Sequence, residues 1–374
     1  MKRNLRLLTV FPLLIIALMV MSISKNESEK VIIGYVGGYR GLVDVSLIAP
    51  KKLSHINYAF INVKSNRAFI NRPETDTVNM RNLVSLKIQN PKLKVLISIG
   101  GWAWSENFSD AALTDTSRAG FAKSAVEIAR KFKLDGLDID WEYPGIAGEE
   151  GNVFRPEDKT NFTLLMAALR DELNKLESET GTKKLLTIAV GGFNNYIVHT
   201  EMDKVQGYLD FVNLMTYDFY PGGGLAVHHT NLYSSEKYNG NSADAAFHAF
   251  NKAGVPASKL VMGIAFYGRM IKLKGEAKNG LADSVQSMSY GKGYTFIRDS
   301  LINKKGFKHY VDKSAKAPYI FNGETKEFMT FDDEKSVMEK CKYVKKNGMG
   351  GVMFWEHDSD LKGYLLDQIN KDIK

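Results

Sequence analysis

The chain has 374 residues, of which 44% are hydrophobic and 25% charged, and its formal net charge is +8 at pH 7. Three of these positive charges lie in the first 24 residues, so the remainder carries a dispersed +5. With no nucleic-acid-binding motif beside it, that modest excess argues against a nucleic-acid partner. The single cysteine, Cys341, excludes an intramolecular disulfide, so the fold must depend on its apolar core.

The first 24 residues combine an early basic cluster with an apolar run from Leu7 to Met21 and small residues at Ser22 and Ser24. This pattern predicts a signal peptide over 1–24, followed by one catalytic domain over 25–374. The alternative is an uncleaved membrane anchor, but the run is shorter than the roughly 20 residues of a spanning helix, and Pro12 interrupts it. We expect a secreted or periplasmic bacterial protein with no membrane contact after cleavage. We also expect a monomer, although no sequence feature specifies the oligomeric state.

Eight short runs rich in β-branched and aromatic residues follow, and helical patterns separate most of them. The runs cover residues 31–36, 55–63, 94–101, 134–143, 185–192, 211–219, 260–268 and 350–356. Between the third and fourth strands, Phe121, Ala125, Ile128 and Phe132 recur at helical spacing, and residues 162–176 keep the same period. Eight apolar strands alternating with amphipathic helices predict an α/β fold of the (β/α)8 TIM-barrel type.

The spacing of these units breaks once, after the seventh strand. About 60 residues rich in Gly, Lys and Tyr separate Gly268 from a helical segment at 332–346. Structureless loops of that length are uncommon in compact domains, so we interpret 269–330 as a small inserted α+β subdomain. Because the loops at the C-terminal strand ends build the active site of such barrels, the insertion should form one wall of the cleft.

The fourth predicted strand, LDGLDIDWEYPG (134–145), carries Asp138, Asp140 and Glu142 at steps of two. Residues at this spacing share one face of a strand, about 6.5 Å apart, while the apolar residues between them share the other face. Carboxylates this close in a partly desolvated barrel cannot all ionise, so at least one pKa should be raised. Glu142, nearest the C-terminal strand end and with the longest reach, is the candidate general acid.

Three other interpretations of these acids are a structural hydrogen-bonded layer, a Mg²⁺ or Ca²⁺ site, and a solvated edge strand. The apolar opposite face disfavours an edge strand. Aromatic residues at most other strand ends disfavour a metal site and suit a pyranose, whose C–H faces stack on aromatic rings. We therefore expect neither a metal nor a cofactor. The aromatic candidates for substrate binding are Tyr35, Phe60, Trp102, Tyr267 and Trp355.

The motif DGLDIDWEYP resembles the DxxDxDxE signature of glycoside hydrolase family 18, which contains chitinases and endo-β-N-acetylglucosaminidases. Asp135 takes its first acidic position. The segments SIGG (98–101), MTYD (215–218), FYGR (266–269) and FWE (354–356) resemble the family's motifs at strands three, six, seven and eight. The insertion is similar to that of the bacterial chitinase branch with a deep cleft, so the resemblance extends over the whole chain after the leader.

The resemblance implies substrate-assisted hydrolysis with retention of configuration. Glu142 would protonate the leaving oxygen while the substrate's own 2-acetamido carbonyl attacks the anomeric carbon. Asp140 would orient the acetamido N–H and share charge and a proton with Asp138, and Tyr217 would hydrogen-bond the carbonyl oxygen. The Trp355 ring would form the floor of the subsite that holds the reacting sugar. The resemblance further implies that Met215, Asp218 and Arg269 shape this subsite, and that Asp135, Ser98, Gly100 and Gly101 give structural support.

Two segments depart from the family pattern. GYVGGYR (34–40) lacks the usual paired aromatics and nearby tryptophan, and FYPGGG follows MTYD in place of the more usual His-Gly. The leading prediction is a secreted chitinase acting on chitin or other N-acetylglucosamine-containing oligosaccharides. The alternatives are an endo-β-N-acetylglucosaminidase acting on N-glycans and a non-catalytic lectin on the same barrel. The presence of Glu142 disfavours the lectin, because such proteins usually lose the terminal acid.

Overall fold

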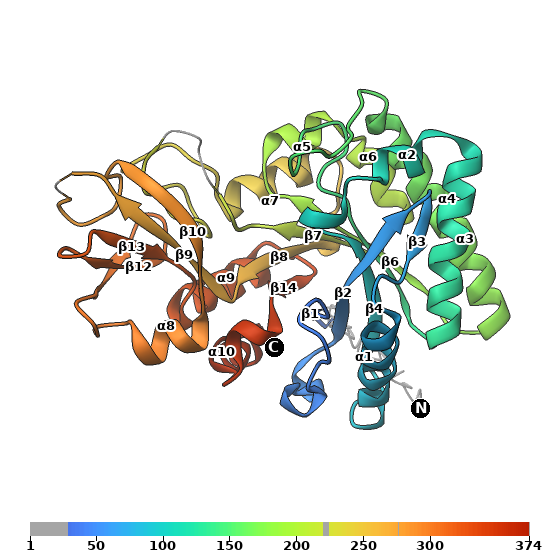
Figure 1. The fold of residues 1–374 in the computed structure, drawn as a ribbon, viewed down its shortest axis with the longest axis horizontal. Helices are drawn as coiled ribbons and strands as arrows, with labels where there is room; N and C mark the ends of the chain where they lie inside the picture. Colours follow the sequence, from blue (N-terminus) through green and yellow to red (C-terminus); the bar gives the residue numbers. More distant parts are fainter. Residues whose placement is uncertain (1–28, 220–223, 276, 374) are drawn as a thin grey trace, which may run out of the picture.

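The computed structural model describes residues 29–219, 224–275 and 277–373, so the predicted signal peptide lies outside the described residues. Within these ranges, eight parallel strands close a barrel in the order β1-β14-β8-β7-β6-β5-β4-β2, and β2 pairs back to β1 (Figure 1). The barrel strands are β1 (Val31–Gly37), β2 (His55–Lys64), β4 (Lys94–Gly100), β5 (Gly136–Asp140), β6 (Leu185–Gly191), β7 (Phe211–Met215), β8 (Leu260–Ala265) and β14 (Gly351–Trp355). The predicted TIM barrel is confirmed. A short strand, β3 (Arg67–Phe69), pairs antiparallel with β2.

Several barrel strands end earlier than their apolar runs predict. β5 ends at Asp140 where the sequence predicts strand to residue 143, and β7 and β8 end at Met215 and Ala265. The last residues of these runs leave the barrel ladder, and Glu142, Tyr217 and Tyr267 among them line the barrel mouth. The Glu142 N–H, for example, donates to Ser105 Oγ at 2.9 Å rather than to a neighbouring strand.

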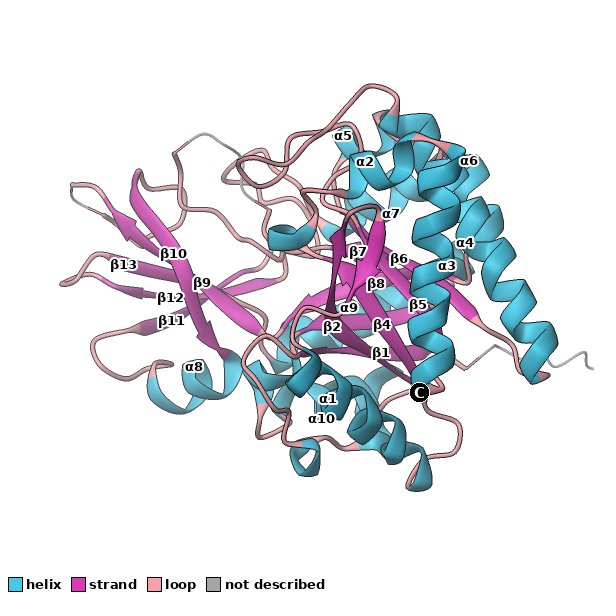
Figure 2. Ribbon diagram, turned by 45° about the vertical axis from the view of Figure 1, so that its right-hand side comes forward, coloured by secondary structure: helices cyan, strands magenta, loops and turns pink. Residues whose placement is uncertain are grey.

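The α-helices surround the barrel, as Figure 2 shows. They are α1 (Pro73–Ser85), α2 (Phe108–Leu113), α3 (Asp115–Phe132), α4 (Asp158–Thr180), α5 (Asn194–Val198), α6 (Met202–Val205), α7 (Ala243–Lys252), α9 (Glu334–Lys346) and α10 (Tyr364–Ile373). Short 3-10 helices cover 45–47, 50–52, 86–88, 102–104, 206–208, 257–259 and 357–360. The two helices predicted from periodicity correspond to α3 and α4. Reciprocal capping boxes start α3 at Thr114 and α9 at Asp333.

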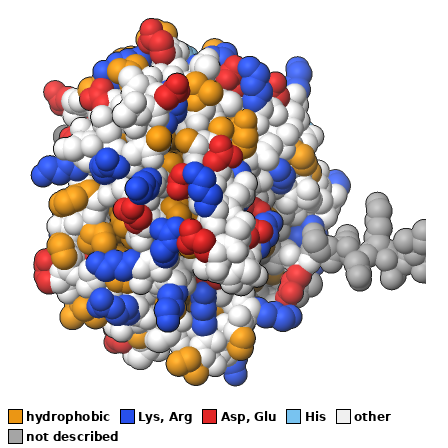
Figure 3. All heavy atoms as spheres, turned by 90° about the vertical axis from the view of Figure 1, so that its right-hand side faces the viewer, with side chains coloured by type: hydrophobic (Ala, Val, Ile, Leu, Met, Phe, Trp, Pro, Cys, Tyr) orange, Lys and Arg blue, Asp and Glu red, His pale blue; other side chains and the backbone are white. Residues whose placement is uncertain are grey.

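The outer surface on the side of α3 and α4 carries interspersed charges. Figure 3 shows basic and acidic side chains alternating with apolar ones over this face, without one dominant sign. This agrees with the dispersed charge of the sequence. Among the described helices, none is both long and apolar enough to cross a membrane.

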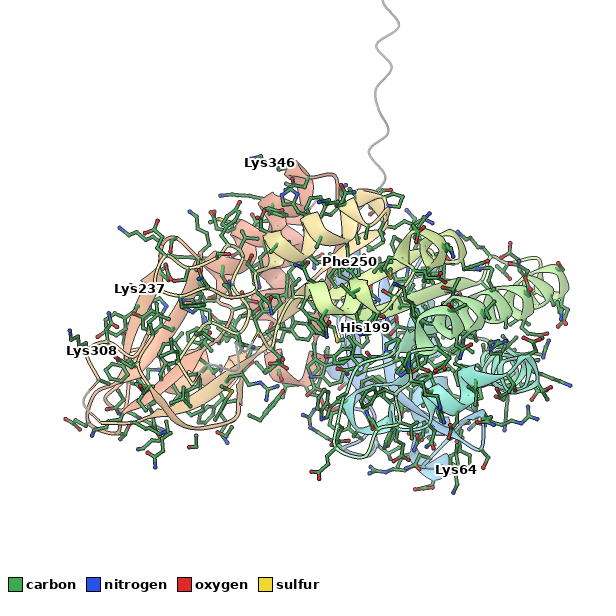
Figure 4. All side chains as sticks on the ribbon, turned by 90° about the horizontal axis from the view of Figure 1, so that it is seen from above. Lys64, His199, Lys237, Phe250, Lys308 and Lys346 are labelled. Carbon is green, nitrogen blue, oxygen red and sulfur yellow. The ribbon has the colours of Figure 1, made fainter. Side chains whose placement is uncertain are left out.

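Between β8 and α9 the chain forms a second sheet, which stands beside the barrel (Figure 1). Its antiparallel order within the described residues is β10-β9-β13-β12-β11. The elements are β9 (Tyr267–Leu273), β10 (Val285–Gly293), α8 (Tyr294–Ser300), β11 (Lys308–Asp312), β12 (Ala317–Asn322) and β13 (Glu327–Thr330). This is the α+β insertion expected after the seventh barrel strand. In Figure 4, Lys308 marks its outer edge, and Lys64 at the end of β2 lies on the opposite side of the molecule.

A buried ion pair connects the barrel to the helix that follows the insertion. Lys340 of α9 is fully buried and donates to Asp332 Oδ2 at 2.6 Å and to Thr230 Oγ1 at 2.7 Å. The same Asp332 oxygen accepts the N–H of Ala265 at the end of β8. Three segments distant in the sequence therefore meet at one carboxylate.

Candidate active site

The deepest of the three acids, Asp138, is held by neighbouring strands on both sides. Its Oδ2 accepts hydrogen bonds from Tyr35 and Ser98, both at 2.8 Å, and its Oδ1 accepts from Thr187 at 2.5 Å and Asn213 at 3.1 Å. Burial raises the pKa of Asp138, while these four hydrogen bonds lower it. Both carboxylate oxygens are thus engaged by donors from β1, β4, β6 and β7, which fixes the side chain in the centre of the barrel.

Asp140 lies one step closer to the mouth and is bonded differently. It is buried, and its Oδ1 has no hydrogen-bond partner among the described residues. Burial, followed by the charges of Glu142 and Asp138, raises its pKa well above the usual range. A buried carboxyl oxygen without a partner is unfavourable, so this atom is suited to receive a donor from a bound molecule.

Glu142 extends from the strand end into the cavity. Burial raises its pKa to about 7; the charges of Asp218 and Glu149 act in the same direction, and a hydrogen bond from Tyr143 opposes them. A carboxyl group that titrates near neutral pH can donate a proton and take one back during a reaction. Glu142 therefore has the protonation behaviour of a general acid and base.

The acids open into a cavity of about 860 Å³ whose floor is aromatic. Trp355 at the end of β14 stacks against Phe60, with ring centroids 5.4 Å apart and planes at 19°. Trp102 stands half-exposed at the rim and contacts Tyr143 edge-on. The predicted residues that line this cavity are Tyr35, Phe60, Gly100, Trp102, Asp140, Glu142, Met215, Tyr217, Asp218, Tyr267, Arg269 and Trp355. A flat apolar floor beside polar groups suits a sugar ring.

A second cavity of about 500 Å³ adjoins the first. The residues common to both cavities are Glu142, Tyr143, Met215, Tyr217 and Asp218. Phe193 and Asn241 line only the second. A substrate chain that occupies both cavities would therefore pass from one cavity to the other at Glu142.

Asp218 lies in the wall where the two cavities meet. Its backbone adopts a left-handed conformation with φ of +56°. Arg269 donates from Nε and NH2 to the two carboxylate oxygens at 2.8 and 2.6 Å, and His229 Nδ1 lies 3.3 Å from Oδ1. Burial alone would raise the pKa of Asp218, but the hydrogen bonds from His229 and Arg269 outweigh it and hold that pKa well below its usual range. Asp218 is therefore an anion at the wall of the site.

The predicted supporting residues occupy different depths. Asp135 does not line either cavity: it accepts the Val95 N–H at 2.7 Å and pairs with Lys87 at 2.5 Å near the opposite ends of the strands. Gly100 and Gly101 have positive φ angles, and an added Cβ would lie 2.2 Å from the Asp140 carbonyl oxygen and 2.7 Å from the Phe60 ring, respectively. Because these two glycines of the SIGG segment lack a Cβ, the Asp140 backbone and the Phe60 ring can lie close to it beneath the cavity.

Several residues at the site were not among the predicted site residues, and four of them, Thr187, Asn213, Tyr39 and Tyr290, bear most on its geometry. Thr187 and Asn213 hold Asp138, and each is a lone polar residue inside an apolar strand, which is a signal that sequence reading had available. Tyr39 and Tyr290 line the cavity from a loop and from the inserted sheet. Tyr290 stacks on Tyr267 at 5.0 Å, and its position depends on the tertiary placement of β10.

Comparisons with known proteins show the family and agree with the fold. The model of the family described as "Glycosyl hydrolases family 18" matches residues 31–360. Chitinase A1 of Niallia circulans is 35% identical over 91% of this chain, which spans 58% of the length of that relative. A solved glycoside hydrolase family 18 N-acetylglucosaminidase from Paenibacillus barengoltzii is 41% identical, with a TM-score of 0.85 over 92% of this chain and 99% of the other. The solved chitinase ChiW from a Paenibacillus species is 37% identical, with a TM-score of 0.86 over 92% of this chain and 43% of the other.

Proposed function

Because the chain belongs to glycosyl hydrolase family 18, we propose that this glycoside hydrolase cleaves β-1,4 linkages between N-acetylglucosamine units, as a chitinase does, by substrate-assisted retaining catalysis. One observation carries the proposal: among the described residues the buried Asp140 Oδ1 has no hydrogen-bond partner, and it lies beside Glu142, whose pKa burial raises to about 7. The first group can receive an acetamido N–H, and the second can protonate the adjoining glycosidic oxygen.

In this mechanism the reacting sugar lies on Trp355, and its acetamido N–H donates to Asp140. The carbonyl oxygen of the same group attacks the anomeric carbon as Glu142 transfers its proton to the leaving oxygen, which gives an oxazolinium ion and a free acceptor sugar. Glu142 then takes a proton from water, and the water oxygen attacks the anomeric carbon from the face that the leaving group vacated, as the bond between that carbon and the acetamido oxygen breaks and the acetamido group is restored. Two inversions give retention, and Glu142 returns to its protonated form.

In the proposed mechanism, Tyr217 hydrogen-bonds the attacking carbonyl oxygen. Its hydroxyl contacts only the thioether of Met353, at 3.8 Å, among the hydrogen bonds of the described residues. Thioether sulfur is a weak acceptor, so the hydroxyl is available to a stronger one such as an amide oxygen. Asp138 and Asp140 share a proton, and the negative charge that remains on the pair lies beneath the cation that forms. We further propose export by the N-terminal leader, because a polymeric substrate lies outside the cell.

The test is a mass-spectrometric time course of the purified protein with N-acetylchitohexaose, with a high-mannose N-glycopeptide in parallel. Shorter oligosaccharides should appear from the hexamer with the parent, and Glu142→Gln should lower kcat by about 10³-fold. Cleavage of the glycopeptide alone would move the assignment to an endo-β-N-acetylglucosaminidase. Binding of the hexamer without cleavage by either protein would make the chain a lectin.

A further inference from the structure

The two cavities fix the direction in which a substrate chain would run. Glu142 lines both, and it protonates the oxygen on the anomeric carbon, so the leaving group extends into the second cavity. The donor sugar stays over Trp355 in the first cavity. In a pyranose, C4 lies across the ring from C1, so the donor's O4 points away from Glu142. A longer donor chain would continue from O4, away from the second cavity. Tyr39 and Tyr290 line the first cavity but not the second, and the Tyr39 ring lies beside Trp355.

Tyr39 lines the first cavity, and Arg40 and Glu356 hold its side chain from outside the lining. The Tyr39 ring lies nearly parallel to the Trp355 ring, at 16° and 6.4 Å between centroids. Its hydroxyl donates to one oxygen of the buried Glu356 carboxylate, and Arg40 NH2 donates to the other at 2.6 Å. The Arg40 guanidinium also lies 4.8 Å from the centre of the Tyr39 ring. The Tyr39 ring is thus held by a hydrogen bond at its hydroxyl and by the Arg40 guanidinium over its face.

The backbone of this segment is as firmly held as its side chains. Gly37 and Gly38 bring it against the barrel, since an added Cβ would lie 2.6 Å from the Tyr39 ring and 1.9 Å from the Tyr58 hydroxyl, respectively. Arg72 NH1 donates to the Tyr39 carbonyl at 2.7 Å, and Asn79 of α1 bonds both Gly41 O and Val43 N at 2.9 Å. A substrate would have to break several of these contacts to displace Tyr39.

Another ring that lines the first cavity comes from the insertion. Tyr290 of β10 lies flat on Tyr267, at 5.0 Å and 9°, and the Arg269 guanidinium lies 4.9 Å from the Tyr290 ring. Arg269 is in turn fixed by its two hydrogen bonds to Asp218. The first cavity is therefore lined by one firmly held ring from the β1 loop and by another from the inserted sheet.

Given the proposed function, on which this inference rests, we infer that Tyr39 and Tyr290 limit the donor side to a single N-acetylglucosamine. The enzyme then removes N-acetylglucosamine units one at a time from the non-reducing end of β-1,4-linked oligosaccharides. It acts as an exo-N-acetylglucosaminidase rather than by cutting within the chain. The second cavity receives the remaining oligosaccharide as the leaving group.

Two fluorogenic substrates and one labelled oligosaccharide test this with the parent protein. The 4-methylumbelliferyl glycoside of N-acetylglucosamine should release its fluorophore from the start, whereas the chitobioside should do so only after a lag, since one sugar must leave first. N-acetylchitohexaose labelled at its reducing end should first give the labelled pentamer. Chitobiose as the first product, or fluorophore from the chitobioside without a lag, would overturn the inference and leave the proposed function intact. Inactivity on all three substrates would overturn both.

A pair of variants tests the role of Tyr39 itself. Tyr39→Ala should open the donor side, so that the lag disappears and kcat/KM for the chitobioside rises relative to the monosaccharide glycoside by about tenfold. Tyr39→Phe keeps the ring and should retain the parent's product order. Thermal unfolding midpoints of both variants show that the fold is intact. If folded Tyr39→Ala gives the same products as Tyr39→Phe, Tyr39 does not set the donor length.

Discussion

Arg269 and Asp218 form a bidentate pair in which the guanidinium Nε and NH2 meet the two carboxylate oxygens at 2.8 and 2.6 Å. The pair joins β9 of the insertion to the segment after β7, and so connects the inserted sheet to the barrel mouth. It also keeps Asp218 ionised. The charge of Asp218 raises the pKa of Glu142, so the insertion acts through this carboxylate on the proposed general acid.

The parent enzyme should lose activity as the pH rises through about 7. Glu142 must carry a proton to protonate the leaving oxygen, and burial raises its pKa to about 7. Above that pH the deprotonated form accumulates, and kcat should fall about tenfold per pH unit. A profile of kcat against pH on an N-acetylglucosamine oligosaccharide measures this limb. An alkaline limb near the ordinary glutamate value, about 4.3, would contradict the assignment.

Asp218→Asn should move the same limb to lower pH. Removing the negative charge takes away one cause of the raised Glu142 pKa, and it leaves the positive charge of Arg269 nearby without its carboxylate partner. Both effects stabilise ionised Glu142, so we expect a shift of up to about one pH unit. Glu149→Gln is the matched control, since Glu149 acts on Glu142 in the same direction but less strongly. An unchanged limb in Asp218→Asn would show that the two carboxyl groups are not coupled.

Asp140→Asn should lower kcat far more than Thr187→Val, which removes a hydrogen bond to Asp138 deeper in the barrel. The variant keeps the size of the side chain but removes the charge under the developing cation, and we expect a loss of about 10²- to 10³-fold in kcat. Thr187→Val removes one of four donors to Asp138 and should lower kcat by about tenfold or less. Steady-state kinetics of the two variants on one substrate compares these effects. Equal losses would mean that Asp140 acts only through the packing of the barrel interior.

The barrel and its line of acids could be read from the sequence because both follow from local geometry. A strand alternates its side chains with a period of two, so Asp138, Asp140 and Glu142 had to share a face wherever the strand lay. The apolar residues between them, buried in the structure, showed that the other face was covered as well. The strand ends were less predictable, because the apolar run continues past the last ladder hydrogen bond at Asp140.

The walls of the site depend on contacts between segments that are distant in the sequence. Tyr290 reaches the cavity only because β10 pairs with β9, and His229 reaches Asp218 only because its loop folds over the end of β7. Tyr39 is placed by two glycines and by bonds from α1, which no spacing rule links to the catalytic strand. Sequence reading found the departure at GYVGGYR, but not that Tyr39 would lie beside Trp355.

The buried Lys340–Asp332 pair should be essential to the stability of the fold. Lys340→Met would leave the Asp332 carboxylate buried without its cation, and we expect the free energy of unfolding to fall by about 3–5 kcal/mol. Lys346→Met, at an exposed position of the same helix, should change it by less than about 0.5 kcal/mol. Urea unfolding of the parent and both variants measures the difference. Because Asp332 also accepts from Thr230 Oγ1, Ala265 N and Ser336 Oγ, the double change Lys340→Met with Asp332→Leu should recover only part of the loss. Full recovery would mean that those three bonds contribute little, and a Lys340→Met variant as stable as Lys346→Met would show that the ion pair itself is dispensable.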